Sequence, residues 1–173
     1  PVVLFPIRIW PILILSSNAA FQAACSSVGG SGIRAIMAVR RSVARLAAVQ
    51  ALYEVDLVNA NIEIVLENFF AKRWLPSEFN TDTKSSQIEP DRDWLVNLVQ
   101  GVATSRDTLD SHIGRALSGK WTVERLETLI RVILQSAVFE LINKPNVPAS
   151  VIINEYLNVA HAFFEGPENK LVN

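Results

Sequence analysis

Three arginines lie close together at the start of an amphipathic segment. Arg40, Arg41 and Arg45 open the stretch RRSVARLAAVQALY, which covers residues 40–53. A guanidinium group can grip a phosphate with two parallel hydrogen bonds, and each neutralised phosphate releases condensed counterions. Because no acidic residue precedes Glu54, the first 53 residues carry a formal charge of +5, and the remaining 120 residues carry −6. This asymmetry points to a basic surface for RNA or DNA beside a more acidic body.

Two other side chains of the same segment suit RNA. Tyr53 can stack on an unpaired base, and Gln50 can read a base edge, as in the recognition of single-stranded RNA. Tyr53 also follows Leu46 and Val49 at helical spacing, which suits a place in the core equally well. The sequence leaves both interpretations of Tyr53 open.

Helices must position these side chains, because the apolar pattern after residue 37 is helical and no strand-like alternation is sustained. The predicted fold class is all-α. The segment 123–142 is apolar nearly all round, so we predict that it is the central buried helix, capped by Thr122. Residues 76–90 are polar and rich in turn formers, which predicts a surface loop. The remaining helices are expected over residues 42–57 and 62–74, from 91 to near Gly119 with a bend near Gly101, and from Pro148 onward.

Residues 1–36 differ in composition from the rest of the chain, since two arginines are their only charges. Three interpretations are a targeting peptide, real structure, and sequence extraneous to the natural protein. Pro6 and Pro11 interrupt a helix here, and the apolar run is shorter than the roughly 20 residues that span a bilayer. We expect the extraneous interpretation, with Met37 as the natural start, a domain proper over 37–173 and no membrane partner.

Catalytic and metal-binding chemistry find little support. His112 and His161 lack acids or cysteines at metal-ligand spacing, so we expect them at the surface. The single cysteine, Cys25, excludes a disulfide framework and a cysteine-based zinc site. No glycine-rich phosphate loop or acid/base pair of carboxylates is recognisable. The sequence therefore predicts a protein that is not an enzyme, with neither metal nor cofactor, and its cysteine-free main part suits the cytoplasm.

Two glutamates lie in strongly apolar stretches. Glu140 and Glu155 are expected to be partly buried, and a buried carboxylate in a helical bundle usually pairs with an arginine. Arg131 and Arg125 are the expected partners.

Several segments in order along the chain resemble the NusB family of bacterial transcription antitermination factors. The resemblance covers residues 40–173. It rests on RRSVARLAAVQALY at 40–53, LVQGV at 98–102 with LD at 109–110, ILQSAVFEL at 133–141, VP at 147–148, VIINEY at 151–156, AHAFF at 160–164 and KLVN at 170–173.

The resemblance implies an all-helical fold of two packed three- to four-helix subdomains, over about 40–118 and 122–173. It also implies that the protein binds the boxA RNA element together with the ribosomal protein NusE. That complex joins RNA polymerase and supports processive transcription of ribosomal RNA operons. Some members of the family form homodimers, and the sequence does not fix the oligomeric state.

Site residues follow from the resemblance. The implied RNA-binding residues are Arg40, Arg41, Arg45, Gln50 and Tyr53, with a second RNA contact at Thr104 and Arg106. The implied contacts with the protein partner are Glu124, Glu165 and Glu168.

The chain departs from the family pattern at three places. Gln135 stands where the family usually has arginine, which puts a phosphate contact from that helix in doubt, and Phe139 replaces a tyrosine. From the resemblance we also expect the last helix of the family to be only partly present in residues 1–173. Two alternative functions remain: an N-terminal RNA-binding domain of a ribosomal RNA cytosine methyltransferase, and a helical interaction module with no RNA role.

Overall fold

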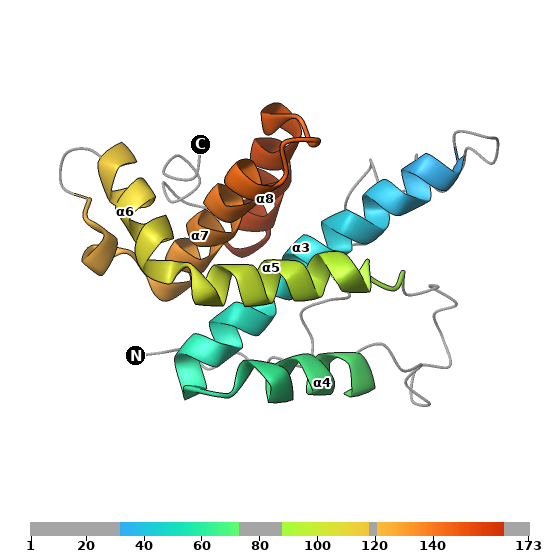
Figure 1. Ribbon diagram of the computed structural model, residues 1–173, viewed down its shortest axis with the longest axis horizontal. Helices are drawn as coiled ribbons and strands as arrows, with labels where there is room; N and C mark the ends of the chain where they lie inside the picture. The colour runs from blue at the N-terminus through green and yellow to red at the C-terminus, as the bar shows by residue number, and fades with distance from the viewer. Residues whose placement is uncertain (1–31, 73–87, 118–120, 165–173) are drawn as a thin grey trace. The chain divides into compact units, whose positions relative to one another are not determined.

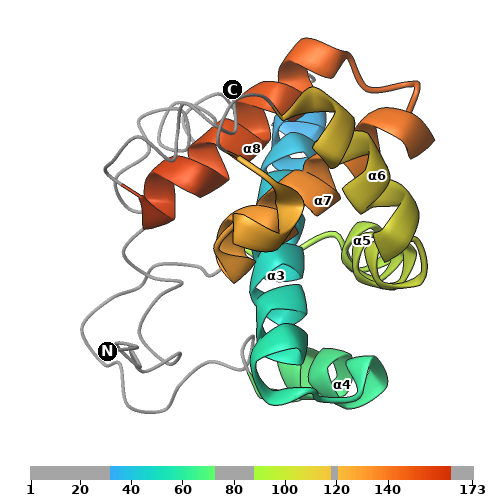
Figure 2. The ribbon, with the colours of Figure 1, turned by 90° about the vertical axis from the view of Figure 1, so that its left-hand side faces the viewer.

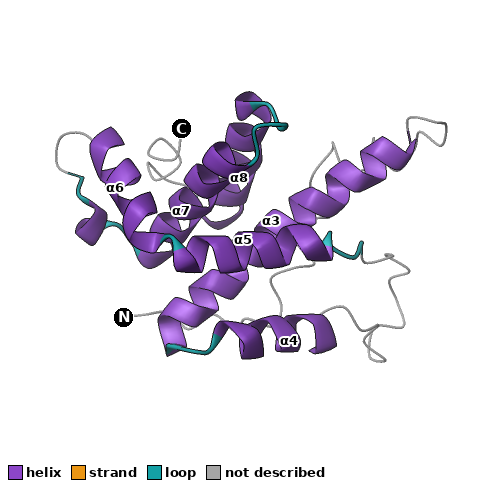
Figure 3. Cartoon of the chain, viewed as in Figure 1, coloured by secondary structure: helices purple, strands orange, loops and turns teal. Residues whose placement is uncertain are grey.

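The computed structural model describes residues 32–72, 88–117 and 121–164. The chain divides into two units, Pro1–Val39 and Arg40–Asn173, and the second unit is described below. Every regular element in the described ranges is a helix (Figure 3), which confirms the all-α prediction. The elements are α3 (Gly32–Val58), α4 (Ile62–Lys72), α5 (Arg92–Thr104), α6 (Arg106–Ala116), the short 3₁₀ helix η1 (Val123–Arg125), α7 (Thr128–Asn143) and α8 (Ala149–Phe163).

Helix α3 is buried on nearly all sides between Val43 and Val49. Its small side chains Ala44, Ala47 and Ala48 are almost inaccessible to solvent, so neighbouring helices approach the α3 backbone closely. Figures 1 and 2 show this part of α3 running past α5 and α7. The sequence pattern predicted an amphipathic helix with one apolar side, whereas in the structure this part of α3 is buried on nearly all sides.

Helix α7 packs against α5, α6 and α8, as expected for the central buried helix. Its start differs from the prediction, because Val123–Arg125 form a 3₁₀ turn and α7 begins only at Thr128. Leu126 and Glu127 have extended backbone angles between the two. This break lets Leu126 pack in a cluster with Ile113 and Ile130.

The predicted long helix from residue 91 is two helices. Asp91 caps the first, since its carboxylate accepts a hydrogen bond from the Trp94 amide at 3.1 Å. Helix α5 ends at Thr104 and α6 begins at Arg106, so the chain bends at Ser105 and not at Gly101.

Gly101 instead marks the place where α5 meets α7. A Cβ atom at this position would lie 2.0 Å from Cζ of Phe139, which is a buried ring on α7. The absence of a side chain therefore lets the ring lie directly against the α5 backbone.

Helix α3 begins at Gly32, ten residues before the predicted start at residue 42, and the other helix boundaries agree with the predictions within a few residues. Helix α8 begins at Ala149, with Pro148 at its N-cap position. Residues 76–87 of the predicted loop and residues 165–173 lie outside the described residues. None of the described helices is long and apolar enough to cross a bilayer.

A Gly101→Ala substitution tests the close contact with Phe139. We expect a loss of about 1–3 kcal/mol in the free energy of unfolding, as is usual for overpacking. Urea unfolding followed by circular dichroism measures it. The matched control is Gly114→Ala on α6, where the nearest atom to the added Cβ is Val123 Cγ2 at 3.5 Å. The control should be neutral or stabilising by up to about 1 kcal/mol, because alanine is the better helix former. Equal effects of the two substitutions would refute this role of Gly101.

Candidate nucleic-acid interface

Arg45 is buried in the interior, with only 3% of its surface exposed. Its Nε donates hydrogen bonds to both carboxylate oxygens of Glu140, at 3.1 and 3.0 Å, and its Nη2 bonds the same carboxylate. Its Nη1 donates to Glu155 Oε2 at 3.1 Å. The network joins α3 to α7 and α8.

Tyr156 completes this network from α8. Its hydroxyl donates to Glu140 Oε2 at 3.0 Å, and the side chain is fully buried. Burial, with the nearby Glu140 carboxylate, raises the pKa of Tyr156 well above its usual value.

This arrangement changes two expectations. The prediction that Glu140 and Glu155 are partly buried and paired with arginine is confirmed, but the partner is Arg45 and not Arg131 or Arg125. The interior position of Arg45 also differs from the predicted phosphate contact, because two carboxylates occupy its guanidinium.

An Arg45→Ala substitution leaves Glu140 buried without a cation. We expect a loss of about 3–5 kcal/mol in the free energy of unfolding, since an uncompensated buried charge is strongly destabilising. Urea unfolding measures it. Arg92→Ala is the control, because Arg92 pairs with Glu89 at the exposed surface, and its loss should be about 1 kcal/mol or less. A loss for Arg45→Ala no larger than that of the control would contradict the structural role.

The Tyr156 hydroxyl gives the protein an alkaline limit of stability. The unfolded chain releases this proton near pH 10, whereas the folded chain holds it to higher pH. The unfolded state therefore binds fewer protons above about pH 10, and stability falls as pH rises. We expect the stability difference between wild type and Tyr156→Phe to be constant below about pH 10 and to shrink above it. Unfolding midpoints from pH 7 to 11 measure this, and a difference that stays constant over the whole range would count against the pKa shift.

Arg40 and Arg41 lie at the corner where α3 meets the start of α5. Arg40 Nε donates to the Glu89 carbonyl at 3.1 Å, and the Asp91 amide donates to the Arg40 carbonyl at 3.1 Å. The Arg41 guanidinium lies 4.5 Å from the centroid of the Trp94 ring, and its side chain is 40% exposed. Its Nε is 3.6 Å from Asp91 Oδ2, too far for a hydrogen bond. Arg41 is thus held against the indole while part of its side chain faces solvent.

Gln50 and Tyr53 lie elsewhere on α3. At about 1.5 Å and 100° per residue, Tyr53 is about 18 Å farther along the helix than Arg41 and Gln50 is on the opposite side. Both are partly exposed. Asp56, one turn after Tyr53, accepts hydrogen bonds from Arg106 at 2.6 and 2.9 Å. Arg106 is therefore joined to α3 near the C-terminal end of that helix, far along it from Arg41.

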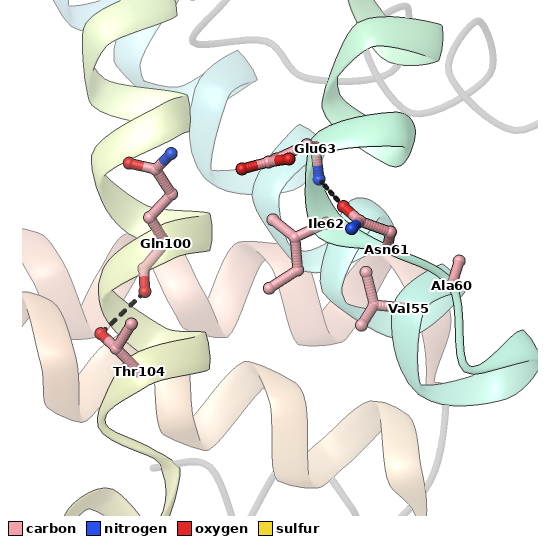
Figure 4. A pocket seen from close by; sticks show the side chains of 7 residues that line it. All are labelled: Val55, Ala60, Asn61, Ile62, Glu63, Gln100 and Thr104. Carbon is pink, nitrogen blue, oxygen red and sulfur yellow. Dashed lines mark hydrogen bonds between the residues drawn. The ribbon is translucent and has the colours of Figure 1, made fainter.

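Thr104 lies at the edge of an open hollow of about 580 Å³ between α3, α4 and α5 (Figure 4). Its hydroxyl donates to the Gln100 carbonyl at 2.9 Å within α5. Val55 and Ile62 line the apolar part of the hollow, and Glu63 adds a negative charge. Because this hollow offers no cation, it is a poor site for a phosphate.

Asp110 ties α6 to α7 on the side that carries Glu124. Burial opposes the charge of Asp110, but hydrogen bonds from Arg131 and Gln135 outweigh it and hold the pKa of Asp110 below its usual value. Gln135 is fully buried, so this position of α7 does not reach the surface.

Glu124 itself is exposed, as a partner contact requires. Glu165 and Glu168 lie outside the described residues. His112 and His161 are both exposed, and the described ranges contain no group of side chains fit to hold a metal ion.

The family model that matches this chain is that of the NusB family, over residues 42–173. The chain belongs to the NusB family. A transcription antitermination protein NusB of Bartonella tribocorum is 40% identical over 134 residues, which are 78% of this chain and 83% of that protein. The NusB of Caulobacter vibrioides is 39% identical and covers 77% of this chain and 87% of its own length. These names describe transcription antitermination proteins and not enzymes, in agreement with the sequence prediction.

Solved NusB structures share the fold. The structure of T. maritima NusB superposes with a TM-score of 0.59 at 25% sequence identity. The match covers 76% of this chain and 84% of the T. maritima chain. A crystal structure of the antitermination factors NusB and NusE in complex with dsRNA gives a TM-score of 0.60 at 20% sequence identity. That match covers 77% of this chain and 89% of the chain in the complex. The described helices therefore have the NusB arrangement.

Proposed function

We propose that this protein is a cytoplasmic transcription antitermination factor that binds boxA RNA together with the ribosomal protein NusE. In this proposal the complex joins RNA polymerase and supports processive transcription of ribosomal RNA operons. The observation that carries the proposal is the arginine corner, in a chain of the NusB family. There Arg41 lies over an indole ring with 40% of its side chain exposed.

Arg40 and Arg41 are the phosphate contacts in this proposal. Arg45 acts as a positioning residue, because its guanidinium is bound by Glu140 and Glu155. In this proposal Tyr53, Gln50 and Arg106 supply further RNA contacts.

Two exposed side chains near η1 suit the protein partner. Trp121 is 46% exposed, and the Glu124 carboxylate faces solvent three residues later. Tryptophan is enriched among the residues that carry most of the energy of protein interfaces. The proposed NusE contact is therefore Trp121 with Glu124.

The methyltransferase alternative has less support than the antitermination function. The relatives named above are antitermination proteins, and this chain covers more than four fifths of their length. An interaction module without an RNA role would bind NusE and show no affinity for boxA RNA, with or without NusE.

A double Arg40→Gln/Arg41→Gln variant tests the RNA contact. We expect weaker binding of a single-stranded boxA RNA in the presence of NusE. The slope of log K against log salt should fall by about 1.4, or about 0.7 for each lost single-strand phosphate contact. Fluorescence anisotropy over a salt series measures both quantities, and a thermal melt checks folding.

The control is Arg115→Gln, which removes one exposed charge from α6. It should leave affinity and slope nearly unchanged. A double variant that is folded and binds with the affinity and slope of wild type would remove these arginines from the RNA contact.

A further inference from the structure

Lys144 is a third cation at the arginine corner, contributed by a different part of the chain. Its ammonium lies 4.8 Å from the centroid of the Trp94 ring, the ring that Arg41 approaches to 4.5 Å. The buried guanidinium of Arg45 lies 5.6 Å from the same centroid. One indole on α5 therefore gathers cations from α3 and from the end of α7.

The backbone of Lys144 is fixed on both sides. Its amide donates to the Glu140 carbonyl at 2.9 Å and ends α7, and its carbonyl accepts from the Val147 amide at 3.0 Å. Helix α7 is held to α3 through Glu140 and Arg45. The position of the Lys144 ammonium thus depends on the same network that orients α3.

The charges of the corner leave Lys144 available for an anion. Among the described residues Lys144 makes no ion pair, and its side chain is partly exposed. Arg45 with Glu140 and Glu155 carries a net charge of −1, and Asp91 adds another negative charge. These two negative charges are opposed by three positive charges, on Arg40, Arg41 and Lys144, so the corner has a net charge of +1. Removal of the Lys144 charge makes the corner neutral.

We propose that Lys144 and Arg41, both held against the Trp94 ring, form a phosphate clamp. In this clamp the Lys144 ammonium and the Arg41 side chain contact neighbouring phosphates of the RNA backbone. Trp94 holds the two cations and does not serve as a stacking platform, because its ring is already approached by three cations. The inference rests on the proposed RNA function and extends the contact from α3 to the turn between α7 and α8.

Lys144→Gln tests the clamp, with Arg115→Gln as the charge-matched control and Lys144→Arg as the variant that keeps the charge. Binding of a single-stranded boxA RNA with NusE is followed by anisotropy over a salt series. For Lys144→Gln we expect about a fivefold loss of affinity at about 0.1 M salt and a slope smaller by about 0.7, as one lost single-strand phosphate contact gives. Lys144→Arg should retain most of the affinity, and Arg115→Gln should match wild type. Thermal melts confirm that each variant is folded.

The outcomes separate this inference from the function on which it rests. Wild-type protein that fails to bind RNA with NusE would overturn both. Wild-type binding with no loss in Lys144→Gln, or with an equal loss in Arg115→Gln, would overturn the clamp and leave the proposed function standing. A loss in Lys144→Gln that Lys144→Arg restores supports the clamp.

Discussion

The guanidinium of Arg45 is buried where α3, α7 and α8 meet, and the rest of the arrangement depends on how its charge is satisfied. A buried cation is tolerated only when carboxylates and hydrogen bonds replace water. Glu140 supplies these contacts from the interior, where its carboxylate also accepts a hydrogen bond from the Tyr156 hydroxyl, and Glu155 supplies one from a partly exposed position. Because the donors of a guanidinium form a rigid fork, the three helices meet in one register when all these bonds are made.

The surface chemistry is coupled to this interior network through Trp94. The indole contacts Arg45 on its buried side and also approaches Arg41 and Lys144, which are partly exposed. The same turns of α3 and α7 thus carry both the buried ion pair and the exposed cations. A change at Arg45 reaches the RNA surface indirectly, through the position of its neighbours.

Helix α5 must approach α7 closely to bring Trp94 to the corner. Gly101 permits this approach, since Phe139 lies against the backbone where a side chain would otherwise stand. At the far end of α5, the partly exposed ion pair between Asp56 and Arg106 joins α3 to α6. Such pairs stabilise less than buried packing does, so the glycine contact and the Arg45 network have the larger effect on the geometry of the corner.

The sequence by itself determined the helical class, most helix positions and the burial of Glu140, because these follow from local periodicity and from the energy of burying charge. It also supplied the resemblance to the NusB family, and the match of the family model over residues 42–173 confirms it. Only the tertiary structure decided that Arg45 faces inward while Arg41, one turn earlier, stays partly exposed. Helical spacing places both arginines on one face, but which of them meets a carboxylate depends on α7 and α8, about 100 residues away in the chain. The grouping of Lys144 with Arg41 was hidden for the same reason, since no local pattern brings the end of α7 to the indole of α5.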